Sequence, residues 1–176
     1  MNSPAPTNQM RISQREFRIG FGFDAHRLEH GRPLWLGGVL IPHTLGLQGH
    51  SDADVLLHAI CDGILGSLSL GDIGIHFPDT DQRYRDIRST ELLRHVADLL
   101  RRSGARVENV DTTVVAQAPR LAPHIPAMME SIADVLRIHR ERVSIKAKTT
   151  EGLGFTGREE GIAAYAVVLV SLETPG

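Results

Sequence analysis

Asp24 and His26 are two residues apart and have side chains that can bind a metal ion. On an extended strand, residues two apart point to the same side, so this carboxylate and this imidazole can converge on one ion. Zinc accepts both oxygen and nitrogen ligands of this kind. An isolated Asp-x-His pair is more often a plain surface pair, so the spacing alone indicates a metal site only weakly.

His58 is the third candidate ligand. With Asp54 and Asp62 it forms a row of polar residues spaced by four, which lies on one face of a predicted helix. By itself the row favours an ion pair on a helix surface. Together with Asp24 and His26, however, it offers three ligands and an open fourth position, the arrangement of catalytic rather than structural zinc. Either Asp54 or Asp62 could then orient the histidine from the second shell.

Three further segments allow two interpretations each. His50 and Ser51 precede the predicted helix, whose free N–H groups could bind an anion or could simply be capped. Residues 70–81 are rich in glycine and aspartate, which is typical of a functional loop or of a cluster of turns. Residues 146–151 end a strand near Arg158, where hydroxyls and the guanidinium could hold phosphate and Glu151 could bind magnesium. A solvated strand end would look the same.

Two glycine patterns resemble dinucleotide fingerprints, G-x-G-x-x-A over residues 20–25 and G-x-G-x-x-G over residues 152–157. Such a fingerprint opens a helix after a strand. Here a turn follows the first pattern and an apolar strand follows the second, so we reject the nucleotide-fold interpretation. The sequence also lacks a G-x-x-x-x-G-K-[ST] motif, which excludes a P-loop kinase or ATPase.

Length and charge restrict the classes of protein further. The 176 residues fit one domain, expected over residues 17–176 after a polar, disordered tail at residues 1–16. A net charge of −2 leaves no broad basic face for nucleic acid or an anionic membrane. Phosphate binding would therefore depend on metal ions or backbone N–H groups. Cys61 is the only cysteine, which excludes an intrachain disulfide and suits the cytoplasm.

Hydrophobic periodicity predicts an alternation of strands and helices. We expect strands over residues 18–24, 34–41, 107–116, 143–149 and 162–172, and helices after an N-cap at Ser51, from about residue 89 to 103, and over residues 123–136. The longest apolar run, residues 162–172, is too short for a membrane helix, which needs roughly 20 residues. The order predicts a single α+β domain with a mixed or antiparallel sheet of four to five strands and helices on one face, as in ferredoxin-like folds.

Five segments occur in an order that resembles the 2-C-methyl-D-erythritol 2,4-cyclodiphosphate synthases, a family of the non-mevalonate isoprenoid pathway. They are RIGFGFDAHRL (18–28), GHSDADVLLHAICD (49–62), LGDIGIHFPDTD (70–81), AQAPRLAPHI (116–125) and KAKTTEGLGFTGREEGI (146–162). The resemblance covers the chain from about Arg18 to its C-terminus. It implies a homotrimer that cyclises 4-diphosphocytidyl-2-C-methyl-D-erythritol 2-phosphate and releases CMP, a phosphorus–oxygen lyase reaction.

The resemblance also implies roles for individual residues. Zinc would be bound by Asp24, His26 and His58, and magnesium or manganese by Glu151, while His50 and Thr149 would stabilise the transition state. Residues 116–122 would form a cytidine diphosphate pocket supplied by a neighbouring subunit. The residues implied to contact substrate are Asp24, Ala25, His26, His50, Ser51, Asp72, Ile73, Gly74, Phe77, Pro78, Asp79, Thr80, Asp81, Ala116, Gln117, Ala118, Pro119, Arg120, Leu121, Ala122, Lys148, Thr149, Thr150, Glu151, Phe155 and Arg158.

Three positions depart from the family pattern. Arg120 stands where lysine is frequent, Lys148 where several members have threonine, and Glu159 where glycine often follows the arginine. Two other functions remain open: a zinc phosphohydrolase that uses the same three ligands to activate water, and a non-enzymatic, metal-dependent nucleotide-binding module. Release of CMP without net uptake of water would separate the cyclase from the hydrolase.

Overall fold

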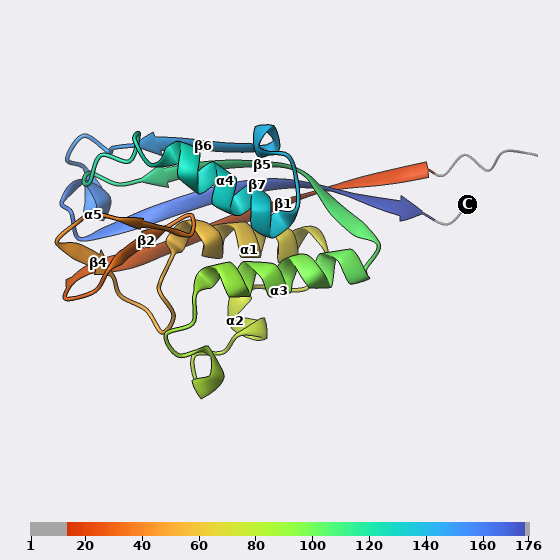
Figure 1. Ribbon diagram of the computed structural model, residues 1–176, viewed down its shortest axis with the longest axis horizontal. Helices are drawn as coiled ribbons and strands as arrows, with labels where there is room; N and C mark the ends of the chain where they lie inside the picture. Colours follow the sequence, from red (N-terminus) through yellow and green to blue (C-terminus); the bar gives the residue numbers. More distant parts are fainter. Residues whose placement is uncertain (1–13, 175–176) are drawn as a thin grey trace, which may run out of the picture.

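Two long antiparallel strands, β1 (Gln14–His30) and β7 (Gly161–Thr174), form the centre of the main sheet in a computed structural model that describes residues 14–174 (Figure 1). Strand β5 (Ala105–Val115) runs antiparallel to β7, and β6 (Val143–Lys148) runs parallel to β5. The short β4 (Leu45–Leu47) completes the order β4-β1-β7-β5-β6. The prediction of one α+β domain with a mixed five-stranded sheet is therefore confirmed.

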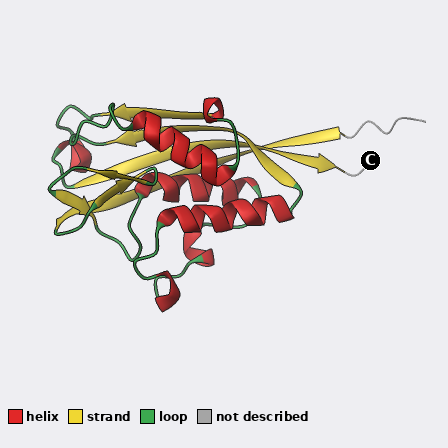
Figure 2. Cartoon of the chain, in the orientation of Figure 1, coloured by secondary structure: helices red, strands yellow, loops and turns green. Residues whose placement is uncertain are grey.

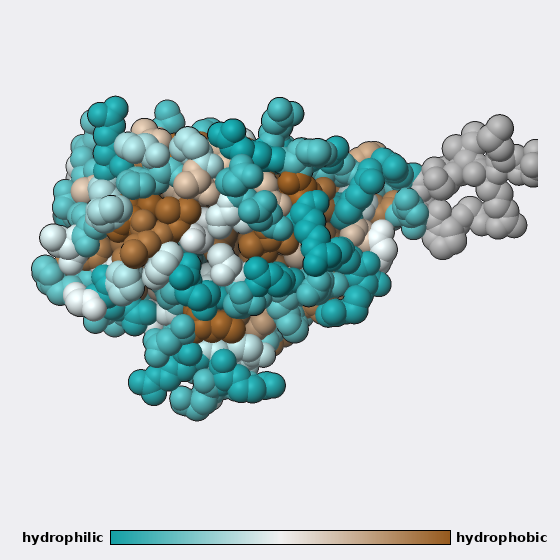
Figure 3. All heavy atoms as spheres, viewed as in Figure 1, coloured by the Kyte–Doolittle hydropathy of each residue, from teal (hydrophilic) through white to brown (hydrophobic). Residues whose placement is uncertain are grey.

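Helices α1 (Val55–Ser67), α3 (Ser89–Arg102) and α4 (Ile125–Leu136) lie together over one face of this sheet (Figures 1 and 2). Helix α1 is buried on almost every side, whereas α3 buries one apolar stripe and turns its charged residues outward. The surface over α3 is accordingly mainly hydrophilic (Figure 3). The remaining elements are short: β2 (Leu34–Leu36), β3 (Val39–Ile41), α2 (Ile73–His76), η1 (Gln82–Tyr84), η2 (Arg140–Arg142) and α5 (Gly154–Gly157).

The alternation of side chains along β1 explains which face the helices cover. Gly20, Gly22, Asp24 and His26 share the helix side, and a side chain at either glycine would collide with α1. A Cβ atom at Gly22 would lie 1.9 Å from the carbonyl oxygen of Ala59. These glycines therefore permit close packing of helix on strand, and the first glycine pattern opens no helix, in agreement with the rejection of a dinucleotide site.

The ferredoxin-like assignment is wrong. A ferredoxin-like fold follows the order β-α-β-β-α-β. Here the long elements follow the order β-α-α-β-α-β-β, and α4 connects the parallel pair β5 and β6. The order of the long elements along the sequence was predicted correctly, but the pairing of strands far apart in the chain, which defines the topology, was not.

Several predicted boundaries also differ. Strand β1 begins at Gln14, so the last residues assigned to a tail belong to a strand, while residues 1–13 lie outside the described part of the chain. Residues 34–41 form a hairpin, β2 and β3, because Gly37 and Gly38 turn the chain with φ values of 59° and 78°. The N-cap of α1 is Asp54 rather than Ser51, and α4 begins at Ile125. Within residues 14–174, no helix combines the length and apolar character needed to cross a membrane.

Candidate metal centre and active site

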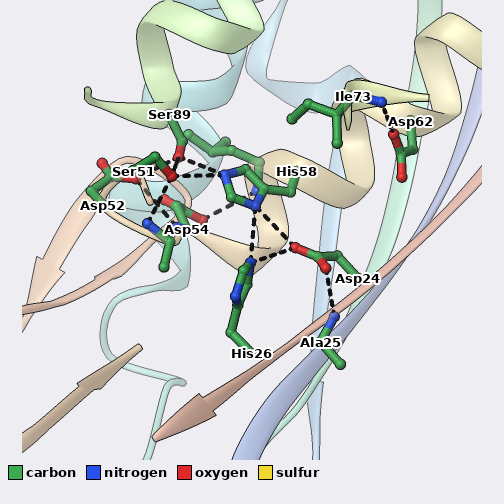
Figure 4. A network of polar contacts seen from close by, with 12 residues as sticks. Asp24, Ala25, His26, Ser51, Asp52, Asp54, His58, Asp62, Ile73 and Ser89 are labelled. Carbon is green, nitrogen blue, oxygen red and sulfur yellow. Dashed lines mark hydrogen bonds and ion pairs between the residues drawn. The ribbon is translucent and has the colours of Figure 1, made fainter. Parts of the chain in front are cut away.

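Asp24, His26 and His58 converge on one point between β1 and α1 (Figure 4). Asp24 Oδ2 lies 2.9 Å from both His26 Nε2 and His58 Nδ1, and the two nitrogens are 3.1 Å apart. Ligands of a tetrahedral zinc ion with bonds of 2.0–2.1 Å are separated by about 3.3 Å. The three atoms are thus close to the spacing of one face of a zinc tetrahedron, and the predicted convergence of these residues is confirmed.

The surroundings of the three atoms favour a bound cation. Burial opposes ionisation of Asp24, but hydrogen bonds and charge from His26 and His58 outweigh it and lower its pKa. Burial likewise opposes protonation of His26, yet the hydrogen bond and charge of Asp24 raise its pKa above the usual value. His26 Nδ1 lies 2.8 Å from the carbonyl oxygen of Gln48, which can only accept, so this nitrogen donates and leaves Nε2 free to bind a metal.

The outer side of the His58 ring differs from the prediction. Neither Asp54 nor Asp62 contacts the ring: Asp54 accepts hydrogen bonds from three backbone N–H groups, and Asp62 accepts one from Ile73 at 2.7 Å. His58 Nε2 lies instead 2.9 Å from Ser89 Oγ and 3.3 Å from Ser51 Oγ. Ser89 is 31 residues away from His58 in the sequence, so no helical spacing could have indicated it.

Asp54 instead joins two elements that flank the site. Its carboxylate accepts from the amides of Gly37, Gly38 and Leu57 at 2.9, 2.7 and 3.1 Å, which ties the hairpin turn to the first turn of α1. Burial, and then the charge of Asp52, raise the pKa of Asp54 to about 6, while the backbone hydrogen bonds act in the opposite direction. Asp54 is thus a buried helix cap rather than a partner of the metal ligand.

A cavity of about 280 Å³ opens beside the three candidate ligands. Residues implied by the resemblance line it together with four that the sequence did not indicate. The first set is His50, Ser51, Ile73, Gly74, Phe77 and Asp79, and the second is Gly49, Tyr84, Ile87 and Leu92. The ring atom His50 Nε2 is buried and has no hydrogen-bond partner within residues 14–174. A buried polar atom without a partner costs free energy, so this nitrogen is a natural contact for a ligand.

Two aspartates of the loop beside this cavity cap short helices. Asp72 caps α2 by accepting from the Ile75 amide at 3.1 Å, and Asp81 caps η1 by accepting from the Arg83 amide at 3.0 Å. Pro78 and Thr80 lie in the turn that joins these two helices. The segment 70–81 is therefore an ordered loop held by two aspartate caps.

A second cavity, of about 330 Å³, is formed by residues 116–122 and 147–149. Gln117 Oε1 accepts from the Gly152 amide at 3.4 Å, which links this cavity to the loop containing Thr150 and Glu151. Thr149 donates to Glu151 Oε1 at 2.5 Å. Within the described residues the two cavities share no lining residue, so one chain does not bring His50 and Thr149 into a single cavity.

The loop after β6 contains two residues with a left-handed backbone. Glu151 has a φ of 52° and Glu159 a φ of 58°, which costs a residue other than glycine on the order of 1 kcal/mol. This conformation explains why glycine would suit position 159. Phe155 lies beside Ala25 and His26 at a smaller hollow, and Arg158 donates to Glu160 at 2.8 Å. Nothing in the structure explains the arginine at position 120 or the lysine at position 148.

Comparison with known proteins agrees with this geometry. The model of the YgbB family matches residues 17–171. A 2-C-methyl-D-erythritol 2,4-cyclodiphosphate synthase from Syntrophomonas wolfei is 65% identical over 153 residues, which are 87% of this chain and 98% of that protein. The bifunctional IspDF of Campylobacter jejuni superposes with a TM-score of 0.87 at 44% identity, over 90% of this chain and 43% of that one.

The IspF of Plasmodium falciparum, solved as a CDP complex, superposes with a TM-score of 0.78 at 34% identity and covers 90% of this chain and 97% of its own. The structural likeness therefore extends over nearly the whole of a solved synthase. Together with the match of the family model and the identity to the bacterial relative, it establishes that the chain belongs to the YgbB family, the family of the 2-C-methyl-D-erythritol 2,4-cyclodiphosphate synthases.

Proposed function

We propose that the chain cyclises 4-diphosphocytidyl-2-C-methyl-D-erythritol 2-phosphate to 2-C-methyl-D-erythritol 2,4-cyclodiphosphate. An oxygen of the 2-phosphate attacks the β-phosphorus of the same molecule, and the bond from that phosphorus to CMP breaks. The observation that carries the proposal is the convergence of Asp24, His26 and His58 at the edge of a cavity that also contains His50. No protein nucleophile is required, because the substrate provides its own.

The chain's own residues would bring the reacting groups together and balance their charge. When bound by Asp24, His26 and His58, zinc would supply Lewis acidity toward the β-phosphate. The unpartnered Nε2 of His50 would donate to a phosphate oxygen, and the wall formed by Phe77, Tyr84 and Leu92 would limit access of water. A chain of net charge −2 can therefore bind a highly anionic substrate without a basic surface.

Glu151 is our proposed ligand for a second divalent cation, magnesium or manganese. Its strained backbone and its contact with Thr149 support a functional role, because strain of this kind gathers at functional sites. Glu151→Gln should leave zinc binding intact and reduce turnover, since it removes a charge with almost no change in size. If added magnesium and manganese fail to alter the rate of zinc-loaded wild-type protein, the assignment of a second cation site to Glu151 is wrong.

The active form is, in our proposal, a homotrimer with sites shared between subunits. The face of the sheet opposite the helices exposes Phe17, Ile19, Phe21 and Phe23 of β1 beside Tyr165 of β7, and Ile19 is 72% exposed. The rings of Phe23 and Tyr165 are 5.0 Å apart. An apolar face of this extent is typical of a subunit interface. A second copy would also supply the cavity of residues 116–122, which one chain keeps apart from the metal ligands.

Mixed trimers test the shared site. His58→Ala removes a metal ligand, and Ala122→Trp fills the second cavity at an exposed position, so each protein should be inactive alone. After random reassembly of equal amounts, about one site in four combines intact halves from different chains, so activity should return to roughly a quarter of wild type. No recovery from trimers shown to be mixed, or a fully active monomer, would contradict the shared site.

The reaction itself is tested in water enriched in oxygen-18. Cyclisation incorporates no solvent oxygen into CMP or the cyclic product, whereas a zinc phosphohydrolase must place one in a product, and phosphorus NMR with mass spectrometry separates the two. Labelled products would favour the hydrolase, and CDP binding without turnover would favour a nucleotide-binding module. We also place the enzyme in the cytoplasm, where the buried Cys61 would remain reduced.

A further inference from the structure

His58 makes contacts on both edges of its ring, and the outer edge is not part of the proposed metal site. Nδ1 faces Asp24 and His26, while Nε2 lies 2.9 Å from Ser89 Oγ and 3.3 Å from Ser51 Oγ (Figure 4). Ser89 Oγ in turn lies 2.5 Å from Asp52 Oδ1. Ser89 is fully buried and Asp52 is 9% exposed, so solvent does not compete for these contacts.

The direction of the hydrogen bonds follows from the number of protons. The Asp52 carboxylate can only accept, and the Ser89 hydroxyl has one proton, so at 2.5 Å the serine donates to the aspartate. Ser89 can then only accept from His58, which places the imidazole proton on Nε2. Nδ1, which lies 2.9 Å from Asp24 Oδ2, is then the ring nitrogen that would bind the metal in exchange for the proton it shares with Asp24.

Asp52 is itself held from its other oxygen. Arg88 Nε donates to Asp52 Oδ2 at 3.0 Å, and the Arg88 guanidinium carbon lies 3.3 Å from the centre of the Trp35 ring. The serine-aspartate pair is thus anchored to β2, which does not carry a metal ligand.

Helix capping does not explain Ser89. A serine near a helix start usually accepts from the backbone N–H groups of the first turn. The N-cap position of α3 is Arg88, which makes no side-chain cap hydrogen bond, and Ser89 follows it as the first helical residue. Its hydroxyl contacts His58, Asp52 and, at 3.5 Å, Ser51. The start of α3 is therefore arranged to hold the histidine of α1.

We propose that Ser89 and Asp52 are positioning residues of the metal site, which fix the tautomer and the orientation of His58. The inference rests on the proposed metal site and adds the groups that prepare one of its ligands. Outer partners of metal-binding histidines typically change metal affinity by 10–100-fold. Ser89→Ala should therefore weaken zinc binding by about this factor while Asp24, His26 and His58 remain present.

The control is Ser67→Ala. Ser67 is a buried serine of α1 that donates to the Ile64 carbonyl oxygen at 2.7 Å, away from the three ligands. Both variants lose one buried hydroxyl, but only Ser89→Ala also removes contacts to His58 and Asp52, so only Ser89→Ala should change zinc affinity in a chelator-competition titration. Nitrogen-15 shifts of the His58 ring in metal-free protein supply a second measurement. Wild type and Ser67→Ala should show a protonated Nε2, and Ser89→Ala a smaller protonated fraction at that nitrogen.

Asp52→Asn tests the same series of hydrogen bonds, from Asp52 through Ser89 to His58, if Ser89→Ala does not fold. An amide has one acceptor oxygen, whereas Ser89 and Arg88 both require an acceptor, so zinc affinity should again fall by about tenfold or more. Zinc affinities within about threefold of wild type for these variants would overturn the positioning role. If His58→Ala binds zinc as tightly as wild type, the metal site itself is wrong. Failure of the positioning role and failure of the metal site therefore give different results.

Discussion

Replacing Gly22 with alanine would force apart the two elements that carry the metal ligands. Gly22 lies two residues before Asp24 on β1, and the atom it approaches, the carbonyl oxygen of Ala59, belongs to the residue after His58 on α1. A Cβ atom at position 22 would be 1.9 Å from that oxygen and 2.7 Å from the Gly63 amide nitrogen. Both neighbours are backbone atoms, so no side chain can rotate away.

The size of the effect follows from these distances. Because Cβ contacts shorter than 3.0 Å are essentially never found, the oxygen must retreat by about 1.1 Å. Zinc ligands tolerate deviations of only about 0.2 Å. Movement of α1 by this amount should take His58 out of reach of a zinc ion held by Asp24 and His26. We therefore expect zinc affinity to fall by about 100-fold or more. Overpacking should also destabilise the fold by about 1–3 kcal/mol.

The matched control is Gly66→Ala on the same helix. Its new Cβ would have only one neighbour within 4 Å, the Phe21 carbonyl oxygen at 3.9 Å, so alanine fits and should stabilise α1 by about 0.5–1 kcal/mol. Zinc affinity is measured by chelator competition, and stability by urea unfolding of metal-free protein at fixed concentration. Gly22→Ala protein that binds zinc as tightly as Gly66→Ala would refute the view that this close approach sets the geometry of the metal site.

Three further perturbations give distinct results. Asp54→Ala removes the cap of α1 and leaves the amides of the hairpin turn without an acceptor, so urea unfolding of metal-free protein should show a loss of about 3 kcal/mol; a loss below about 1 kcal/mol would contradict this role. A hydrogen bond from Ser171 and then two arginines lower the pKa of Glu108 from 4.5 to about 2 against the effect of burial. The stabilisation of the fold by the Glu108 carboxylate is therefore present above pH 4.5 and lost as the pH falls toward 2. After allowance for solvent screening, Glu108→Gln should lower the free energy of unfolding by about 1–2 kcal/mol at pH 7 but by almost nothing near pH 2. A difference between the two proteins that does not shrink with acid would contradict the assignment. His58→Ala should remain folded and bind zinc poorly, whereas the exposed His139→Ala should bind it normally, as metal analysis after dialysis would show.

The sequence by itself determined the features that depend on neighbouring residues. Alternation of side chains placed Asp24 and His26 on one side of β1, and the helical period placed His58 on the polar face of an otherwise apolar α1. The same rules identified the helices and the strands, because local periodicity follows directly from backbone geometry. The order of five motifs then indicated the family, which the comparisons confirm.

The tertiary structure decided the contacts between residues far apart in the chain. Local spacing suggested Asp54 and Asp62 as partners of His58, yet the folded chain uses Asp54 to bind the hairpin turn and gives His58 the hydroxyl of Ser89. The strand order, and with it the departure from a ferredoxin-like topology, was likewise set by pairing across the sheet. The reason is physical: a spacing rule describes one element, whereas a buried polar atom takes whichever partner the packing of several elements brings within hydrogen-bond distance.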